Sequence, residues 1–276
     1  MLSDLEGVVA VDDPHLGHHL GVWRPIPLAW ATCENPPQLT TLLDLKADEP
    51  GYFFAERYRE TWWEPLRELI GARFEAQATE SGEPSGEERF VVKEPGSHVA
   101  PLLAELFPAS KLIFLLRDGR DVVDSWLDAY SEGSWAIPGG AFPVPPEGRI
   151  PLIRWLSEVW AFRCRAVRRA FETRPPEDRI LIRYEDLRVD TTVYLEQICA
   201  MLGLDRDGLQ SLVARHSFDE VPPDQRGPRR AARAARPGGW RENLSADEQA
   251  TMHDVLGGAL EEFGYGAPAG KPAGVA

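Results

Sequence analysis

The stretch that decides the fold runs from residue 111 to residue 125 and reads Lys-Leu-Ile-Phe-Leu-Leu-Arg-Asp-Gly-Arg-Asp-Val-Val-Asp-Ser. Residues 111–116 form a short apolar run, which is typical of a strand buried on both faces of a parallel sheet. Arg117 then lies at the carboxyl end of this strand, where open α/β sheets bind their ligands. Asp118 can cap the helix that follows, and Ser125 lies within that helix. Arg117 and Ser125 could therefore converge on one anion, although an ordinary strand-to-helix junction with an exposed ion pair has the same local pattern.

The length of the chain favours one α/β domain. At 276 residues it can bury a substantial core, and we expect a single domain over residues 1–263. Residues 264–276 are rich in Gly, Pro and Ala, so we expect them to form a flexible tail.

The charge balance limits the partners. There are 30 basic and 44 acidic residues, which leave a formal net charge of -14. This excess of negative charge argues against a general affinity for nucleic acid or anionic membranes, so any anion site must be local. Cys33, Cys164 and Cys199 are few and widely spaced, and they indicate neither a disulfide framework nor a metal site. We read no secretion signal and no membrane anchor, and expect a cytoplasmic location; the oligomeric state stays open.

Strands and helices alternate along the chain. Short apolar runs predict four strands, and apolar residues at helical spacing predict six helices. Strands that are separated by helices indicate parallel pairing. The predicted strands are 7–12, 89–93, 111–116 and 179–184, and the predicted helices are 58–77, 99–107, 120–130, 151–173, 191–202 and 246–263.

Residues 225–241, here called the arginine segment, carry six arginines and no acidic residue. Guanidinium groups match the geometry of phosphate oxygens, so the segment is a candidate for binding a phosphate. A solvated basic face or a flexible loop is the alternative. The arginines are Arg226, Arg229, Arg230, Arg233, Arg236 and Arg241.

The pattern Arg-Asp-x-Arg-Asp-x-x-x-Ser at 117–125 resembles the element with which sulfotransferases hold the 3′-phosphate of 3′-phosphoadenosine 5′-phosphosulfate (PAPS). Three further elements resemble that family in the expected order. They are Val-Lys-Glu-Pro at 92–95, Arg-Tyr-Glu-Asp-Leu at 183–187 and Gly-Trp-Arg-Glu-Asn-Leu-Ser at 239–245. Each element alone is a weak signal, but four in order cover nearly the whole chain.

This resemblance implies a three-layer α/β/α fold with a mainly parallel sheet, of P-loop nucleoside-triphosphate-hydrolase-like descent. It also implies sulfuryl transfer from PAPS to a hydroxyl group of a small-molecule or carbohydrate acceptor, without a metal. Arg117 and Ser125 would hold the 3′-phosphate, Tyr184 would contact the adenine, and Lys93 would stabilise the charge on the transferring group. The remaining implied cofactor-binding residues are Arg233, Arg236 and Trp240.

The base that removes the acceptor's proton is left open by the sequence. Asp13 follows the first predicted strand, and His98 lies five residues beyond the predicted catalytic lysine. These two are our first choices, and His15 and Glu94 remain alternatives. An Asp or His at a strand end is more often a cap or a surface group.

The family's usual first strand and its Gly-x-x-Arg-Ser-Gly-Thr-Thr-like loop do not occur in the sequence. Backbone N–H groups of such a loop normally hold the 5′-phosphosulfate. We therefore expect either a chain that truly starts upstream, which we favour, or a homologue that binds adenosine 3′,5′-bisphosphate without catalysis. Without that strand the sheet should expose unpaired backbone edges. A small-molecule kinase is a weaker alternative, because Gly-x-x-x-x-Gly-Lys-Ser/Thr occurs nowhere.

Overall fold

The structure is a computed structural model, and it describes residues 1–11, 14–20, 22–23, 38–81, 89–136 and 146–266. The chain divides into two compact units. Unit 1 comprises Met1–Arg24, Gln38–Leu116 and Phe162–Glu220, and unit 2 comprises Pro25–Pro37, Arg117–Ala161 and Val221–Ala276. Each unit is described by itself below. The single domain expected over residues 1–263 stays a prediction.

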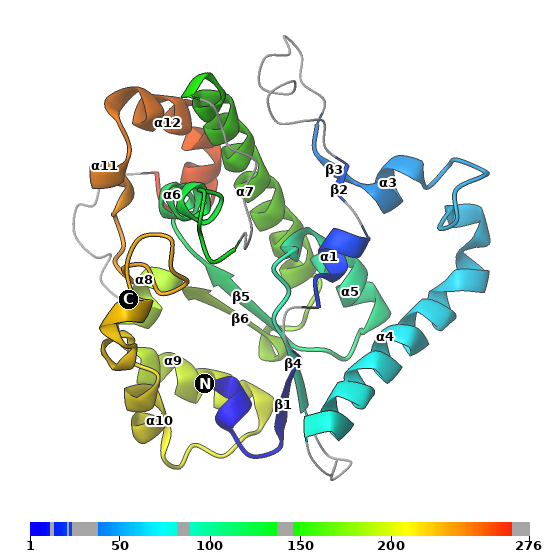
Figure 1. The fold of residues 1–276 in the computed structure, drawn as a ribbon. Helices are drawn as coiled ribbons and strands as arrows, with labels where there is room; N and C mark the ends of the chain where they lie inside the picture. Colours follow the sequence, from blue (N-terminus) through cyan, green and yellow to red (C-terminus); the bar gives the residue numbers. More distant parts are fainter. Residues whose placement is uncertain (12–13, 21, 24–37, 82–88, 137–145, 267–276) are drawn as a thin grey trace. The chain divides into compact units, whose positions relative to one another are not determined.

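All four predicted strands form, and they lie in unit 1 as two parallel pairs (Figure 1). Strand β1 (Val8–Val11) pairs with β4 (Arg89–Val92), and β5 (Leu112–Leu116) pairs with β6 (Arg179–Arg183). The α/β class with parallel pairing is thereby confirmed. A short antiparallel pair, β2 (Val22–Trp23) with β3 (Thr40–Thr41), was not predicted, because two-residue strands leave no alternating pattern to detect.

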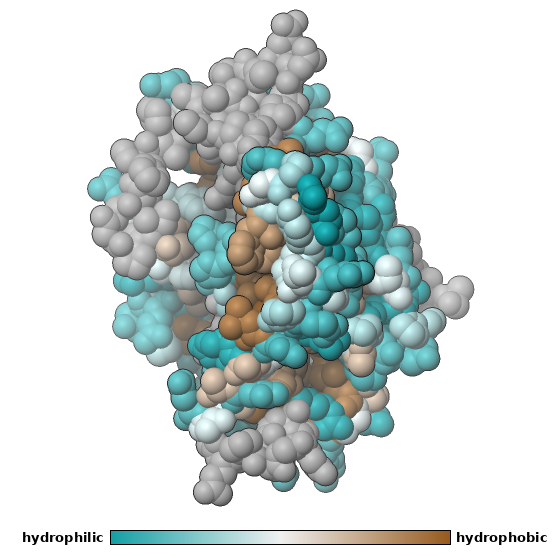
Figure 2. All heavy atoms as spheres, turned by 90° about the vertical axis from the view of Figure 1, so that its right-hand side faces the viewer, coloured by the Kyte–Doolittle hydropathy of each residue, from teal (hydrophilic) through white to brown (hydrophobic). Residues whose placement is uncertain are grey.

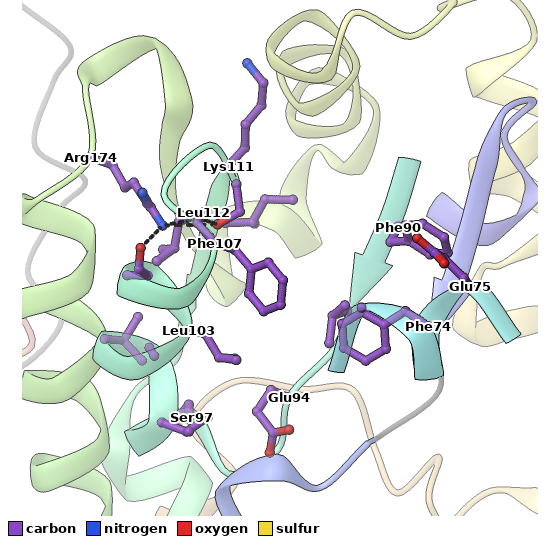
Figure 3. A pocket seen from close by; sticks show the side chains of 18 residues that line it. Phe74, Glu75, Phe90, Glu94, Ser97, Leu103, Phe107, Lys111, Leu112 and Arg174 are labelled. Carbon is purple, nitrogen blue, oxygen red and sulfur yellow. Dashed lines mark hydrogen bonds between the residues drawn. The ribbon is translucent and has the colours of Figure 1, made fainter. Parts of the chain in front are cut away.

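The two parallel pairs are separate two-stranded sheets within the described residues. In that part of the chain β4 pairs only with β1, and β5 pairs only with β6. A cavity of about 460 Å³ is lined by residues of both strands and of helices α4 (Arg59–Ser81) and α5 (Ala100–Leu106). It is seen from close by in Figure 3, where Phe74, Leu103 and Phe107 line it with apolar side chains. This cavity lies beside β4 and β5, and the exposed strand edges expected from the sequence stay a prediction.

The helices of unit 1 follow the predicted pattern closely. Helix α9 (Thr191–Leu202) has the predicted bounds, because Asp190 caps its first turn by accepting from Val193 N–H and Gly203 ends it with a φ of 64°. Its buried Leu195 and Cys199 pack with a short helix that was not predicted, α10 (Leu209–Arg215). The remaining short helices of this unit are η1 (Leu2–Asp4), α1 (Leu16–His19), α3 (Leu42–Lys46), η2 (Glu56–Tyr58), η3 (Ser97–Val99), η5 (Pro176–Asp178), α8 (Tyr184–Val189) and η6 (Phe218–Glu220).

Unit 2 contains the helix that follows the deciding strand. Helix α6 (Gly119–Ala129) and helix α12 (Ala246–Glu262) form as predicted, and Ser245 and Glu248 make a capping box at the start of α12. Helix α7 (Arg149–Glu172) contributes its first part, up to residue 161, to this unit and the rest to unit 1. Short turns of helix complete unit 2: η4 (Pro146–Gly148), η7 (Pro223–Gln225) and α11 (Trp240–Asn243).

The surface on the side of helix α4 is mostly hydrophilic, with a band of hydrophobic side chains (Figure 2). Among the large apolar residues of unit 1, Leu69 of α4 is 67% exposed and Phe90 of β4 is 39% exposed. Phe90 also lines the cavity beside the open strand edge. In the part of the chain that the structure describes, no helix combines the length and the apolarity that crossing a membrane requires.

Candidate functional site

Strand β5 is followed in sequence by helix α6, as predicted. Arg117 directly follows the strand, and Asp118 is the N-cap of the helix, with its carboxylate accepting from Arg120 N–H at 2.9 Å. The same carboxylate pairs with the Arg120 guanidinium through Nε at 2.9 Å and Nη2 at 2.7 Å. Asp118 therefore both caps the helix and pairs with Arg120. The prediction that Asp118 caps this helix is confirmed.

The two predicted phosphate ligands both lie in unit 2. Arg117 and Ser125 are half-buried, and the Ser125 hydroxyl makes no hydrogen bond to any residue that the structure describes. A half-buried hydroxyl of this kind is available to a ligand. Arg117 also acts electrostatically on Asp121, whose pKa is raised by burial while the Gly238 N–H and the Arg117 charge oppose that rise.

Three carboxylates of helix α6, Asp121, Asp124 and Asp128, bind the arginine segment and the residues after it. Asp121 Oδ2 accepts from Gly238 N–H at 2.7 Å, and Oδ1 accepts from Trp240 N–H at 3.4 Å. These contacts place the start of α11 next to the first turn of α6. We call the three carboxylates the carboxylate ladder.

The other two members of the ladder act further along α6. Asp124 forms an ion pair with Arg233 and accepts from Asn243 Nδ2 at 3.0 Å. Asp128 Oδ2 accepts from Arg229 N–H at 2.8 Å. Asp121 and Asp128 thus bind groups of the arginine segment, and Asp124 binds both that segment and Asn243.

Trp240 is the centre of a cation–π group. The Arg120 guanidinium lies 4.8 Å from the centre of its ring and the Arg241 guanidinium lies 4.4 Å from it. The indole Nε1 is buried and has no hydrogen-bond partner among the residues that the structure describes. Buried indole N–H groups usually have an acceptor, so this one is available to a ligand oxygen. Arg236 instead pairs with the exposed Glu242 at the surface.

The predicted catalytic lysine lies in unit 1. Lys93 is exposed and directly follows β4. Its neighbour Glu94 accepts from three backbone N–H groups, at Leu16 (2.8 Å), Gly17 (3.4 Å) and Gly96 (2.6 Å). Glu94 thus ties helix α1 to the turn after β4, which is a structural task that competes with service as a base.

Gly17 and Gly96 come together where Glu94 joins the two segments. A Cβ added to Gly17 would lie 2.8 Å from Gly96 Cα, which is closer than two carbon atoms can pack. This contact was not predicted. Its only signal in the sequence is the presence of glycine at both positions, which local patterns cannot pair.

The candidate bases have different surroundings. His98 is buried, and its Nε2 lies 2.8 Å from the Gly17 carbonyl oxygen. Because the carbonyl can only accept, Nε2 carries the proton and Nδ1 is the nitrogen that could take another. His98 also lines a cavity of about 240 Å³, together with Arg59 and Trp62. His15 precedes α1 with a φ of 51°, and Asp13 lies outside the described residues.

Tyr184, the predicted adenine contact, is half-buried in unit 1. It was expected at the end of a strand, and it is the first residue of α8, directly after β6. Within the described residues no group of three or more His, Cys, Asp and Glu side chains could hold a metal ion.

A model of the sulfotransferase family matches residues 14–208. The chain belongs to the sulfotransferase family. The matched range includes Lys93, His98, Arg117, Ser125 and Tyr184. Arg233, Arg236 and Trp240 lie beyond the matched range. The sequence matches none of the curated proteins with which it was compared.

Among solved structures, this chain is similar to mouse sulfotransferase SULT7A1 complexed with PAP. The sequence identity is 17%, the TM-score is 0.47, and the match covers 66% of this chain and 72% of that chain. It is also similar to the sulfotransferase domain from the curacin biosynthetic pathway, at 16% identity and a TM-score of 0.43, and that match covers 74% of this chain and 69% of the domain. A third similar structure is retinol dehydratase in complex with androsterone and inactive cofactor PAP. The identity is 15%, the TM-score is 0.40, and the match covers 71% of this chain and 61% of that chain.

Proposed function

We propose that this sulfotransferase moves a sulfuryl group from PAPS to a hydroxyl group of a small-molecule or carbohydrate acceptor. The observation that carries the proposal is that Arg117 directly follows β5 in sequence and that the Ser125 hydroxyl on α6 has no hydrogen-bond partner among the residues that the structure describes. A guanidinium and a hydroxyl at the carboxyl end of a strand are suited to phosphate oxygens. Family membership supports the same assignment.

In the proposed reaction PAPS supplies the sulfuryl group and leaves as adenosine 3′,5′-bisphosphate. Arg117 and Ser125 would bind the 3′-phosphate, and Tyr184 would orient the adenine. Lys93 would offset the negative charge that develops on the departing phosphate, which is where charge stabilisation matters most in such a transfer. The Trp240 indole N–H and the guanidinium groups of Arg233 and Arg236 are further donors for the nucleotide.

The acceptor must lose its hydroxyl proton to a base, and we keep Asp13 and His98 as the candidates. His98 Nδ1 is the nitrogen that would take the proton, because Nε2 is bound to Gly17. The cavity of about 240 Å³ beside His98 supports placing the acceptor there. A bound acceptor would then meet Trp62 and Phe54 as apolar walls.

The test is a calorimetric titration with adenosine 3′,5′-bisphosphate and, for comparison, 5′-AMP. We expect Arg117→Ala to weaken binding of the bisphosphate by about 1.5 to 3 kcal/mol, which is the contribution of a hydrogen bond to a charged group. The affinity for 5′-AMP should stay unchanged. Arg215→Ala, which removes an exposed arginine of unit 1, is the matched control and should change neither. Equal affinity of the parent protein for both nucleotides would refute the 3′-phosphate site.

A second candidate is a homologue that binds the bisphosphate without transferring sulfate. Such a homologue would use the same Arg117 and Ser125 to bind the 3′-phosphate. Incubation with PAPS labelled in its sulfate separates the two candidates. Transfer of the label to a hydroxyl acceptor supports the transferase, whereas binding of the bisphosphate without any transfer of label supports the binding homologue. Preference for ATP with magnesium over either 3′-phosphorylated nucleotide would instead support a kinase.

A further inference from the structure

The arginine segment has almost no regular structure of its own. Among its described residues an isolated bridge joins Arg226 to Ala232, and only its two ends, at η7 and α11, belong to helical turns. Arg229 and Ala235 have positive φ angles of 64° and 46°, a conformation that costs a non-glycine residue of order 1 kcal/mol or more. A segment with such a backbone keeps one conformation only when contacts outside it hold it there.

Those contacts come from the carboxylate ladder on one face of α6. Asp121, Asp124 and Asp128 are spaced three and four residues apart, which aligns them along a helix. Together they bind residues between Arg229 and Trp240 of the segment, and Asn243 just beyond it. The strained residue Arg229 is held twice, because its carbonyl also accepts from Trp135 N–H at 3.0 Å.

The burial of the ladder distinguishes it from ordinary surface ion pairs. Asp121 is 1% exposed and Asp124 is 3% exposed. Exposed pairs contribute little, whereas a buried carboxylate that loses its donors is left with an uncompensated charge. The Asp121 and Asp124 carboxylates therefore need the arginine segment in place, just as the segment needs them.

We propose that the carboxylate ladder positions the arginine segment for the nucleotide, so that Asp121, Asp124 and Asp128 are positioning residues for 3′-phosphate recognition. Ser125 lies between Asp124 and Asp128 on the same helix, and Arg117 precedes it. One rigid element thus carries both the predicted phosphate ligands and the groups that set the register of the arginines. Arg233 itself pairs with Asp124. This inference rests on the proposed function for its ligand, but the docking of the segment can be measured without any ligand.

The first experiment is limited proteolysis of the whole protein with trypsin, which cleaves after arginine. Cleavage of a docked segment depends on how often it opens. We expect Asp121→Asn and Asp124→Asn to speed cleavage within residues 225–241 by about tenfold or more, the factor that one lost charged hydrogen bond corresponds to. Glu132→Gln is the matched control, because Glu132 is exposed and makes no hydrogen bond or ion pair with described residues. Unchanged cleavage in both ladder variants would overturn the proposal.

Global unfolding is separated from local release by two further measurements. Cleavage at arginines outside the segment should keep its parent rate, and far-ultraviolet circular dichroism should show a folded protein. If Asp121→Asn fails to fold, Asp128→Asn replaces it, because Asp128 is only half-buried and binds one backbone N–H. Equal acceleration of cleavage everywhere, in every ladder variant, would show that the ladder supports the fold alone and would overturn the positioning role.

The second experiment measures nucleotide discrimination. We expect Asp124→Asn to weaken adenosine 3′,5′-bisphosphate by about tenfold while 5′-AMP keeps its affinity, since only the 3′-phosphate depends on the arginines. A loss of structure would weaken both nucleotides equally, and an unchanged ratio between them would overturn the role in recognition. If the parent protein binds neither nucleotide, the proposed function fails, and the proteolysis result still decides whether the ladder docks the segment.

Discussion

Gly119 packs against the face of the Trp160 indole, because a Cβ on Gly119 would lie 2.7 Å from Trp160 Cδ2. Gly119 is the first residue of α6, directly after the cap, and both residues belong to unit 2. Trp160 is fixed from another side by Phe263, with ring centres 5.8 Å apart in an edge-to-face arrangement. The position of the helix that carries Ser125 is therefore set by contact with a buried ring.

Gly119→Ala should destabilise the protein by about 1 to 3 kcal/mol, because the added methyl group overpacks a rigid buried contact. A urea unfolding curve measures the change. Gly258→Ala is the matched control: it lies inside α12, and an added Cβ would meet no atom within 4 Å. Removing a glycine from a helix interior should stabilise by about 0.5 to 1 kcal/mol, so the two variants should move the midpoint in opposite directions.

Glu94→Gln should lower the free energy of unfolding by about 1.5 to 3 kcal/mol, since the carboxylate accepts from Leu16, Gly17 and Gly96 N–H groups and a neutral amide accepts less strongly. Thermal unfolding monitored by circular dichroism gives the shift. Glu68→Gln, on the exposed surface of α4, should leave the melting temperature unchanged. Parent-like stability of Glu94→Gln would remove the structural role and return Glu94 to the candidate bases.

Arg174→Met should cost about 3 kcal/mol of stability, because the buried guanidinium binds the carbonyls of Ala104 (2.8 Å) and Phe107 (2.9 Å) at the end of α5. These contacts are drawn beside the cavity in Figure 3. The Arg174 cation also interacts favourably with the negative, carboxyl-terminal end of the α5 dipole. Arg169→Met, at an exposed position of α7, is the control in the same urea unfolding measurement. Equal effects of the two substitutions would contradict the carbonyl contacts.

Asp121 gives a pH dependence with a definite sign. Burial raises its pKa above the ordinary value of 3.8, so the folded state binds a proton at a pH where the unfolded state has released it. The parent's stability, measured relative to Asp121→Asn, should therefore fall as the pH rises from about 3.8 through the raised pKa, and stay constant below that window. Urea unfolding of both proteins over a pH series checks this. A relative gain in stability with rising pH would mean that the pKa is lowered.

Much of the fold could be predicted because its signals are local. Each of the four predicted strands forms, and α9 has the predicted bounds. The cap at Asp118 was predicted because a capping residue and its helix are neighbours in sequence. The short β2 and β3 strands and helix α10 carry too few residues to show a period, so no pattern indicated them.

The candidate site was predictable only in part, for the same physical reason. Sequence patterns placed Arg117 and Ser125 on one strand–turn–helix element, because spacing along a helix determines which residues share a face. The partners of that element come from far away in the chain: Gly238 is 117 residues from Asp121, and Arg233 is 109 residues from Asp124. No local propensity encodes such a contact.

The sequence by itself determined the α/β class, the parallel pairing of strands and the presence of a cation and a hydroxyl after β5, because these depend on the hydrophobic period and on sequence neighbours. Only the tertiary structure decided that Glu94 binds three backbone N–H groups, that His98 holds the Gly17 carbonyl and that buried carboxylates of α6 bind the arginine segment. Buried charged and polar side chains need hydrogen-bond partners because water is excluded, and the packing of distant segments determines which partners lie within reach.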